Sequence, residues 1–391
     1  MRLNQLVLRN FRSYTDCEIE FTDRVNLIVG ENAQGKTTLL EAIYFLSTAK
    51  SHRTYPDNEL IRHNESWFYL KGEIAATDGS YPDPEPRNLQ PLNLMTVEVS
   101  NELSGKKRFK FNGIIQKKLS QWIGQFNVVF FSPESLTLVK GSPADRRRFI
   151  DLLISQINSA YLTALQNYQF ALKQRNELLK QIRSKQASPD SLDPWDDILI
   201  AEGISISQTR ARIFDQLKAY VQAKHAELTG DREILELKYQ PSPEKIDDAI
   251  EQEATELFRK GLQSSRSYDI LRGMTSVGPH RDDFKLILES QSAGAMYFQE
   301  AKTFGSQGQQ RTIALALKLG ELELIRETVG KTPIVLLDDV FSELDEERSS
   351  FLFNLLGRLN AQTFITSTRQ EAWVPELGDC RVFTVHDGQV N

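Results

Sequence analysis

An eight-residue motif, Gly30-Glu-Asn-Ala-Gln-Gly-Lys-Thr37, constrains the fold of this 391-residue chain more than any other feature. It follows the apolar run Val25–Val29, which is typical of a buried parallel strand, and the residues from Thr37 to Leu46 have helical spacing. The motif fits G-x-x-x-x-G-K-[ST], in which two glycines allow a tight turn whose backbone N–H groups face phosphate oxygens. The sequence therefore predicts a phosphate-binding loop between a strand and a helix.

The loop residues have distinct expected roles. Lys36 would neutralise the β- and γ-phosphates of a nucleotide, and Thr37 would place its hydroxyl on Mg²⁺. The helix that follows would direct its N-terminus at the anion. The residues expected to bind the nucleotide are Gly30, Glu31, Asn32, Ala33, Gln34, Gly35, Lys36, Thr37 and Thr38.

A second apolar run, Ile334-Val-Leu-Leu-Asp-Asp339, ends in two acids and predicts a strand beside the first. We expect Asp338 to hold Mg²⁺ through water and Asp339 to orient the attacking water, so Lys36, Asp338 and Asp339 are the expected catalytic residues. Lys36 and Asp338 are 302 residues apart (338 − 36). That separation favours an ATPase head assembled from both ends of the chain, with an insertion between its halves.

A third motif precedes a predicted amphipathic helix at 309–327. Its residues Ser306, Gly308, Gln309 and Gln310 are either a polar helix cap or a second anion site, since both place Ser and Gly at a helix N-terminus. The position of Ser306, 32 residues before Asp338 (338 − 306), favours the anion site. The motif then resembles the ABC-type signature, which contacts the γ-phosphate bound to a partner subunit. Ser342 and Asp345 resemble the D-loop of that class.

The middle of the chain has a helical pattern. Apolar residues at steps near 3.5 from Asp145 to Ile182 predict one helix of roughly 55 Å. Ser188–Pro194 interrupts it, and a second helix is expected at 195–228, so the two would form an antiparallel arm. A short helix is expected at 243–262, and the Pro-rich stretch 79–93 is expected to be a loop. The predicted organisation is an α/β ATPase head at 1–140 and 266–391, interrupted by a helical lobe at 141–265.

Composition excludes several classes. The net charge of −6 excludes a wholly basic nucleic-acid binder, although it leaves room for a local basic surface. The two cysteines, Cys17 and Cys380, and five scattered histidines show no metal-binding spacing, and the cysteines could form one disulfide or remain thiols. The N-terminus lacks a signal-peptide pattern and no apolar run reaches membrane-spanning length. We therefore expect a cytoplasmic protein without a membrane partner.

Taken together, the order of these motifs resembles that of the ABC-type ATPase heads of the SMC and DNA-repair group. Three further segments resemble the RecF family of that group: Leu8–Tyr14, Phe131–Asp151 and Gly278–Asp283. The resemblance covers essentially the whole chain. It implies ATP and Mg²⁺ as cofactors, and an ATP-dependent homodimer that binds DNA at single-stranded gaps or junctions. It also implies work with RecR and RecO to load RecA in DNA repair, DNA replication restart and the SOS response.

Two departures from other ABC-type proteins suggest weak ATPase activity that acts as a timer. The acid after Asp338 is Asp339 rather than Glu, and the stretch Thr363–Thr368 ends in hydroxyls where transporters place a histidine. Glu134 is a candidate for the Q-loop equivalent. Two other function classes remain open, the ATPase subunit of a transporter or other SMC-like machine and an ATP-dependent nuclease, although the helical arm and the lack of a nuclease segment disfavour them.

Clustered cations are the candidates for DNA contacts, because phosphate binding needs only concentrated positive charge. Taken alone, however, such a cluster is more often a solvated face than a DNA contact. Arg12 and Arg53 are candidates for contacting the nucleotide or for coupling it to DNA. The candidate DNA-binding residues are Lys106, Lys107, Arg108, Lys110, Arg146, Arg147 and Arg148, with further cations along the arm.

Overall fold

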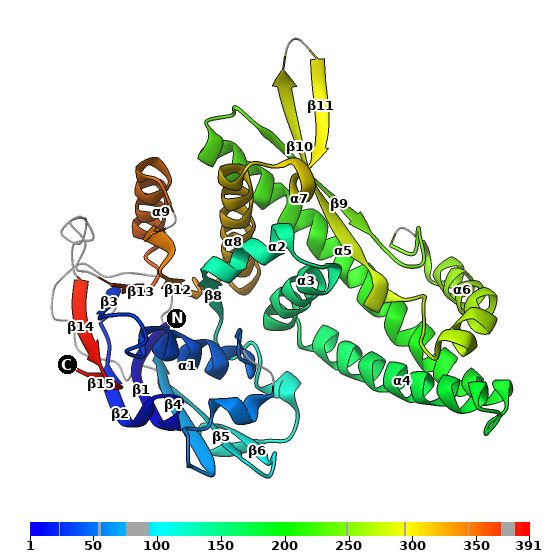
Figure 1. Ribbon diagram of the computed structural model, residues 1–391, viewed down its shortest axis with the longest axis horizontal. Helices are drawn as coiled ribbons and strands as arrows, with labels where there is room; N and C mark the ends of the chain where they lie inside the picture. The colour runs from blue at the N-terminus through cyan, green and yellow to red at the C-terminus, as the bar shows by residue number, and fades with distance from the viewer. Residues whose placement is uncertain are drawn as a thin grey trace. The chain divides into compact units, whose positions relative to one another are not determined.

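The chain divides into two compact units in the computed structural model (Figure 1). Unit 1 comprises residues 1–135 and 321–391, and unit 2 comprises residues 136–320. The structure describes residues 1–22, 24–53, 56–75, 94–247, 249–292, 295–342, 344–368 and 380–391. The loop expected at 79–93 lies outside these residues. Among them, no helix is long and apolar enough to cross a membrane, and neither Cys17 nor Cys380 forms a disulfide.

Unit 1 contains two six-stranded sheets. One is antiparallel, in the order β2-β1-β4-β5-β6-β7. In the other, β3, β13, β12, β8 and β14 are parallel and β15 closes one edge, giving the order β15-β14-β3-β13-β12-β8. The strands are β1 (Arg2–Phe11), β2 (Tyr14–Glu20), β3 (Val25–Val29), β4 (Trp67–Ala75), β5 (Leu94–Glu102), β6 (Lys107–Phe111), β7 (Ile114–Gln116), β8 (Val128–Phe131), β12 (Ile334–Asp338), β13 (Thr363–Ser367), β14 (Cys380–His386) and β15 (Gln389–Val390).

Helix α1 (Lys36–Thr48) forms the core of unit 1. It contacts strands of both sheets, including β4 and β5 of one and β8, β12 and β13 of the other. Sequence periodicity predicted a single apolar side, but nearly every residue of α1 is buried because both faces are covered. The second long helix of the C-terminal segment, α9 (Glu346–Leu359), begins at the capping side chain of Asp345, which accepts a hydrogen bond from the Arg348 amide.

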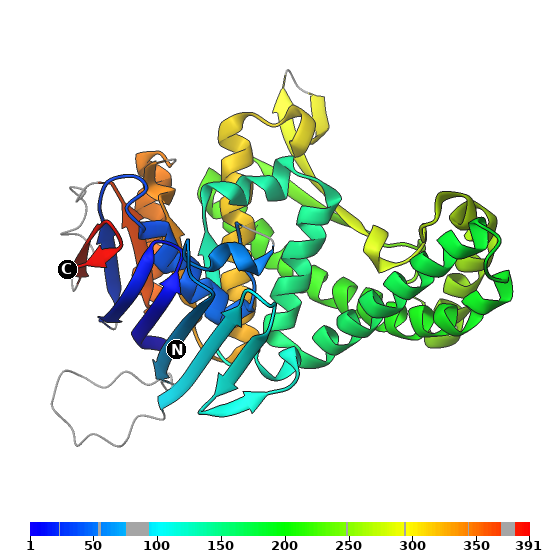
Figure 2. The ribbon, with the colours of Figure 1, turned by 60° about the horizontal axis from the view of Figure 1, so that its bottom comes forward.

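Unit 2 is mainly helical. Helices α4 and α5 run antiparallel, since Asn167 bonds Glu202 and Arg175 bonds Asp196, and α6 packs on both of them (Figures 1 and 2). A three-stranded antiparallel sheet in the order β11-β10-β9 packs beside them, with β9 against α5. The elements are α2 (Thr137–Lys140), α3 (Pro143–Ile157), α4 (Ser159–Arg183), α5 (Asp193–Thr229), β9 (Ile234–Gln240), α6 (Glu251–Arg272), β10 (Asp283–Ser292), β11 (Ala295–Glu300) and α7 (Ala301–Phe304); α8 (Gln307–Val329) continues into the residues of unit 1.

The prediction of one long helix from Asp145 to Ile182 is wrong. Asn158 has extended backbone angles (φ −145°, ψ 101°), so it ends α3. Its side chain then accepts a hydrogen bond from the Tyr161 amide and caps α4. The apolar period continues across this break because both helices bury one side, which is why periodicity alone did not reveal it.

Other boundaries also differ from the expectations. The helix expected at 243–262 is α6 at Glu251–Arg272, and strands β8, β9, β11, β14 and β15 were not predicted. Residues 266–320, expected in the ATPase head, are compact with unit 2. The reason is that β10 pairs with β9 along its length and the C-terminal part of α6 packs on α4, so this stretch completes the helical unit.

We expect Asn158→Ala to destabilise the protein by about 1 kcal/mol, because the α4 N-terminus loses its side-chain acceptor. Urea unfolding followed by circular dichroism would measure the change. Gln166→Ala, an exposed substitution within the same helix, is the matched control and should be neutral or slightly stabilising. Equal midpoints for the two variants would contradict the capping role of Asn158.

Candidate nucleotide-binding site

The parallel sheet brings the two predicted phosphate-site motifs together. Strand β13 lies between β3 and β12, with Thr366 opposite Ile28 on one side and Asp338 on the other. The loop after β3 and the acids at the end of β12 therefore lie at the same edge of the sheet. Thr37 Oγ1 donates a hydrogen bond of 2.9 Å to Asp338 Oδ1, which joins residues 301 positions apart in the sequence.

Lys36 is folded over the loop that precedes it. Its Nζ donates to the carbonyl oxygens of Gly30 at 2.6 Å and Glu31 at 2.7 Å. An ammonium group has three donors, so the side chain can also bind a further acceptor such as a phosphate oxygen. Burial lowers the pKa of Lys36, and Asp339 and Asp338 oppose that effect.

Thr366 is a site residue that sequence reasoning did not single out. Its Oγ1 donates to Asp338 Oδ1 at 2.7 Å and accepts from the Asp339 amide at 3.0 Å. It therefore holds both acids of the β12 terminus. The sequence contains a signal for it, because the stretch Thr363–Thr368 ends in hydroxyls, but only strand pairing shows which hydroxyl faces Asp338.

The donor set at this point fits Mg²⁺. The Thr37 hydroxyl and the Asp338 carboxylate are hard oxygen ligands of the kind that Mg²⁺ prefers, and such sites usually take one or two protein oxygens and leave the rest to water and phosphate. Burial raises the pKa of Asp338, although hydrogen bonds from Thr366 and Thr37 favour its charged form. Asp338 is 8 % exposed, so a cation there would offset the cost of burying its carboxylate.

Other residues that the sequence analysis proposed for the site lie near Asp338. Glu134, which follows β8, and Arg53 both act electrostatically on the Asp338 carboxylate. Asp339 is exposed and has a left-handed backbone (φ 51°). Ser342 donates from Oγ to the Asp339 carbonyl at 2.8 Å, which ties the expected D-loop to the end of β12.

Arg12 is engaged within the protein. Its guanidinium makes a bidentate contact with Glu41 of α1, at 3.0 and 2.9 Å, and Glu41 is fully buried. Ser51 also donates to Glu41. Arg12 therefore links the β1–β2 turn to α1, and the structure shows it as a support of the helix that follows the phosphate loop.

The signature-like residues have two different environments. Ser306 and Gln309 form a reciprocal cap at the start of α8: the Gln309 amide donates to Ser306 Oγ at 3.2 Å, and the Ser306 amide donates to Gln309 Oε1 at 2.8 Å. Gln310 is buried and donates to the Ala301 carbonyl. Ser306 and Gly308 are exposed, so these two residues are the part of the motif that another molecule can reach.

Two of the basic candidates for DNA contact are internal. Arg146 is 5 % exposed and makes a bidentate ion pair with Asp283, at 2.7 and 2.9 Å. Arg147 donates to the Asp282 carbonyl at 2.7 Å. These contacts fix the start of α3 to the segment that precedes β10, which removes Arg146 from the DNA-binding candidates and leaves Arg147 half-buried in a structural contact.

Most of the basic side chains on β6 and its flanking residues are paired with acidic side chains. Lys107 bonds Asp57 and the Ala49 carbonyl, lies over the Phe45 ring, and has its pKa lowered by burial. Arg108 and Lys110 pair with Glu102 at 3.4 Å and Glu98 at 3.8 Å, and both cations are 44 % exposed. Lys106 and Arg148 are exposed. Exposed pairs are weak, so Lys106, Arg108, Lys110 and Arg148 remain as candidates.

The segment Gly278–Asp283 is a buried junction of unit 2. Asp282 accepts from Arg210 at 2.8 Å and from the Ser242 amide at 2.7 Å, and Arg210 is 2 % exposed. The His280 ring bonds the Tyr168 hydroxyl through Nδ1 at 2.7 Å and the Thr275 carbonyl through Nε2 at 3.0 Å. Because a carbonyl can only accept, Nε2 carries the proton and Nδ1 accepts from Tyr168.

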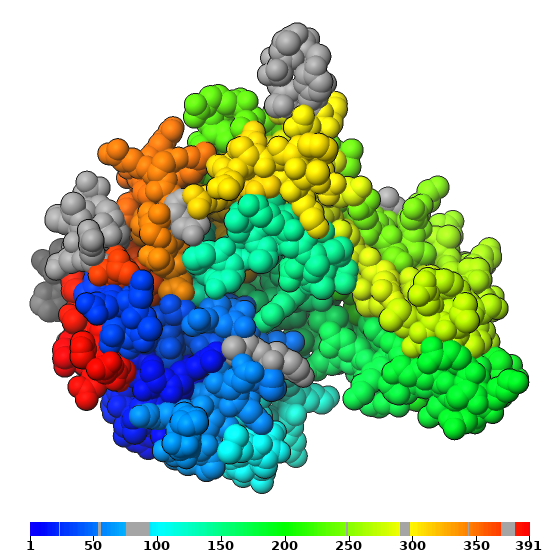
Figure 3. Space-filling view, in the orientation of Figure 1, coloured from blue at the N-terminus to red at the C-terminus, as the bar shows by residue number. Residues whose placement is uncertain are grey.

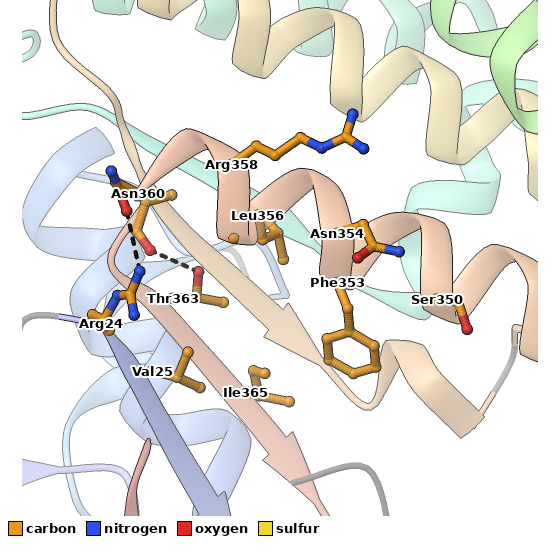
Figure 4. A pocket seen from close by; sticks show the side chains of 12 residues that line it. Arg24, Val25, Ser350, Phe353, Asn354, Leu356, Arg358, Asn360, Thr363 and Ile365 are labelled. Carbon is orange, nitrogen blue, oxygen red and sulfur yellow. Dashed lines mark hydrogen bonds between the residues drawn. The ribbon is translucent and has the colours of Figure 1, made fainter. Parts of the chain in front are cut away.

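A pocket of about 560 Å³ lies between α9 and the parallel sheet (Figure 4). It is lined by Val25 and Thr363, the first residues of β3 and β13, and by Phe353 and Leu356 of α9, with Arg24 at its rim. The phosphate loop follows the last residue of β3 instead. This pocket is therefore at the opposite end of the strands from the candidate nucleotide site.

We expect the buried His280 to make stability depend on pH. Burial lowers the pKa of His280 from 6.5 to about 4. Between pH 4 and pH 6.5 the unfolded chain therefore binds more protons at this histidine than the folded chain does. The free energy of unfolding falls as the pH is lowered from 6.5 towards 4. His280→Gln should flatten this dependence in urea unfolding measured at several pH values, whereas the exposed His63→Gln should not. Parallel pH profiles for the two variants would contradict the role of His280.

Comparisons with known proteins identify the family of this chain. Residues 2–390 match the family model of the RecF/RecN/SMC N-terminal domain. The chain is 40% identical to the DNA replication and repair protein RecF of an Exiguobacterium species, over all of this chain and 99% of the relative. It is 41% identical to RecF of Bacillus cereus, over all of this chain and 98% of that relative.

Solved structures give the same result. A structure of the recombination mediator protein RecF with ATP in the RecFOR pathway matches with a TM-score of 0.87 and 34% identity, over all of this chain and 96% of that one. The Smc head domain of Pyrococcus furiosus matches with a TM-score of 0.55 and 18% identity, over all of this chain and 95% of that one, which shows a shared ABC-type head fold. The chain therefore belongs to the RecF family of DNA replication and repair proteins.

Proposed function

We propose that this chain is a DNA-binding ATPase that forms a dimer when it binds ATP and acts in recombinational repair. The observation that carries the proposal is the hydrogen bond between Thr37 and Asp338, because it places a phosphate loop and an acid of the Mg²⁺-binding type at one sheet edge. The 34% identical RecF structure with ATP supports ATP as the nucleotide. Lys36, Thr37 and the loop amides would hold the phosphates, and Asp338 would hold Mg²⁺, which neutralises charge that develops during phosphoryl transfer.

Slow hydrolysis fits the arrangement of the acids. Asp339 is the group that would orient water, but it is exposed and sits on a left-handed backbone whose amide is tied to Thr366. A water-orienting group that is shorter than Glu and solvated is poorly preorganised for catalysis. Turnover well above about 10 s⁻¹ in the presence of DNA, which is ordinary for enzymes, would contradict the role of hydrolysis as a timer.

Dimerisation would use the exposed part of the signature. Ser306 and Gly308 lie at the N-terminus of α8, where backbone amides and the helix dipole favour an anion. In the proposed dimer they contact the γ-phosphate bound to the second copy, and Ser342 and Asp345 serve as the D-loop residues. The relation to the RecFOR pathway supports RecR and RecO as partners at single-stranded gaps, with RecA loading and the SOS response as the consequences.

Two substitutions separate nucleotide binding from dimerisation. Lys36→Ala removes the cation that faces the β- and γ-phosphates, so we expect it to abolish ATP-driven dimers. Ser306→Arg blocks the signature, so we expect it to bind ATP and remain monomeric. Size-exclusion chromatography with light scattering, with a slowly hydrolysed ATP analogue and gapped DNA, gives the oligomeric state.

Ser264→Arg, at an exposed position of α6 that belongs to neither motif, is the control for the added charge and bulk. It should dimerise as the wild type does. A wild-type protein that binds ATP and stays monomeric under all conditions would exclude the proposed dimer.

Salt dependence tests the remaining basic candidates. We expect Lys106→Glu to weaken DNA binding and to reduce the slope of log K against log salt by about 0.9, if its ammonium contacts one phosphate. Lys260→Glu on α6 carries the same charge change at another exposed site and should leave the slope unchanged. Equal slopes for the two variants would remove Lys106 from the DNA-binding surface.

A further inference from the structure

The turn of the C-terminal hairpin has two backbone donors that do not take part in the strand pairing. Strands β14 and β15 are joined by Asp387 and Gly388, which both have a left-handed backbone, with φ of 47° and 72°. This is the geometry of a two-residue hairpin turn, and Asp-Gly is a favoured sequence for it. The amides of the two turn residues lie outside the β14–β15 ladder, which pairs His386 with Gln389. They therefore need acceptors elsewhere or contact with water.

Both donors bind one residue of the phosphate loop. The Asp387 amide donates to Gln34 Oε1 at 2.6 Å, and the Gly388 amide donates to the Gln34 carbonyl at 3.2 Å. All of these residues belong to unit 1. The C-terminal strands lie at the surface beside the N-terminal strands (Figure 3), and β15 contacts β2. The turn is thus a surface element that holds the loop from outside.

The hairpin also approaches the loop too closely for a larger residue. A Cβ atom on Gly388 would lie 2.6 Å from the Ser13 carbonyl oxygen, and a Cβ atom on Gly30 would lie 2.4 Å from the Val385 carbonyl oxygen. Such distances are well below van der Waals contact. Glycine at both positions lets the hairpin, the β1–β2 turn and the phosphate loop meet backbone to backbone.

The contacts orient consecutive peptide groups of the loop. In a trans peptide the C=O and the following N–H point in opposite directions. The turn holds the Gln34 carbonyl, and the Tyr14 hydroxyl donates to the Gly35 carbonyl at 3.2 Å. The amides of Gly35 and Lys36 are therefore directed away from these supports. Loop amides with a fixed direction are the groups that bind phosphate.

We propose that the turn at Asp387–Gly388 is a positioning element of the phosphate loop, which sets the affinity for nucleotide by holding Gln34. The inference rests on the proposed ATP binding and assigns a role to the last strands of the chain. The turn touches no phosphate in this scheme. It acts through Gln34, so disturbing it should weaken nucleotide binding without removing any group that contacts the nucleotide.

A pair of glycine substitutions isolates this effect. Gly388→Ala and Gly330→Ala introduce the same methyl group at almost the same left-handed angle, φ 72° and 69°. A Cβ atom on Gly330 meets nothing within 4 Å, whereas the one on Gly388 would push the turn away from Ser13. Binding of a fluorescent ATP analogue should be about tenfold weaker in Gly388→Ala, because the loop amides would no longer be well oriented to donate hydrogen bonds to the charged phosphates. Its affinity should be unchanged in Gly330→Ala.

Equal affinities in the two variants, at equal thermal stability, would overturn the proposal. A double-mutant cycle distinguishes an effect that acts through Gln34 from a general loss of stability. If the turn acts through Gln34, the variant with both Gln34→Ala and Gly388→Ala should bind no more weakly than Gly388→Ala alone. Full additivity of the two losses would show that they act independently.

The unmodified protein provides a second measurement that does not depend on the folding of Gly388→Ala. Coupling between two sites is reciprocal, so ATP must stabilise the turn if the turn favours ATP binding. Hydrogen exchange of the segment 386–391 should slow when ATP is added to the wild type, and should not slow in Lys36→Ala. Bound ATP without slower exchange overturns the inference alone. Absence of ATP binding by the wild type instead contradicts the proposed function.

Discussion

The parallel register of β3, β13 and β12 is the constraint on which the site depends. It places Thr366 opposite both Ile28 and Asp338, so the loop after β3 and the acid at the end of β12 meet at one edge. The Thr37 and Thr366 hydroxyls then both donate to Asp338 Oδ1 and hold its carboxylate in place. A shift of one residue in either strand pair would turn these side chains to the other face of the sheet. The remaining elements of unit 1 support this edge: α1 is buried between two sheets, and the C-terminal turn holds Gln34.

Unit 2 depends on a different interaction, a set of buried arginines. Arg175 and Arg210 are almost fully buried, and each contacts two carboxylates from distant segments: Asp196 and Asp269 for the first, Asp151 and Asp282 for the second. Removing one partner from such an arrangement costs about 3–5 kcal/mol, because the other charge is left without compensation. These contacts link α3, α4, α5, α6 and the segment before β10. They also account for two acids of the segments Phe131–Asp151 and Gly278–Asp283, since Asp151 and Asp282 both pair with Arg210 inside unit 2.

Sequence reasoning succeeded where a short motif carries its own geometry. The phosphate loop, the acid strand, α5 and the helix that follows the signature, α8, come from local patterns. Sequence reasoning failed where contacts with residues distant in the chain determine the structure or the burial of a side chain. The apolar period across Asn158 did not show the helix break, and Arg146 looked like a surface cation until Asp283 was placed beside it. The β14–β15 hairpin had a readable signal, Asp387-Gly388 between β-prone residues, but this signal is short.

By itself, the sequence determined the chemical groups of this protein and the order in which they occur: a loop for phosphate, an acid at a strand end, and a polar helix start. These depend on residue type and on spacing within a few positions. Only the tertiary structure decided which groups meet, because contacts such as Thr37 with Asp338 and Gln34 with Asp387 cross more than 300 residues. It also decided which charges remain on the surface, since burial and pairing depend on strands and helices that are distant in the chain.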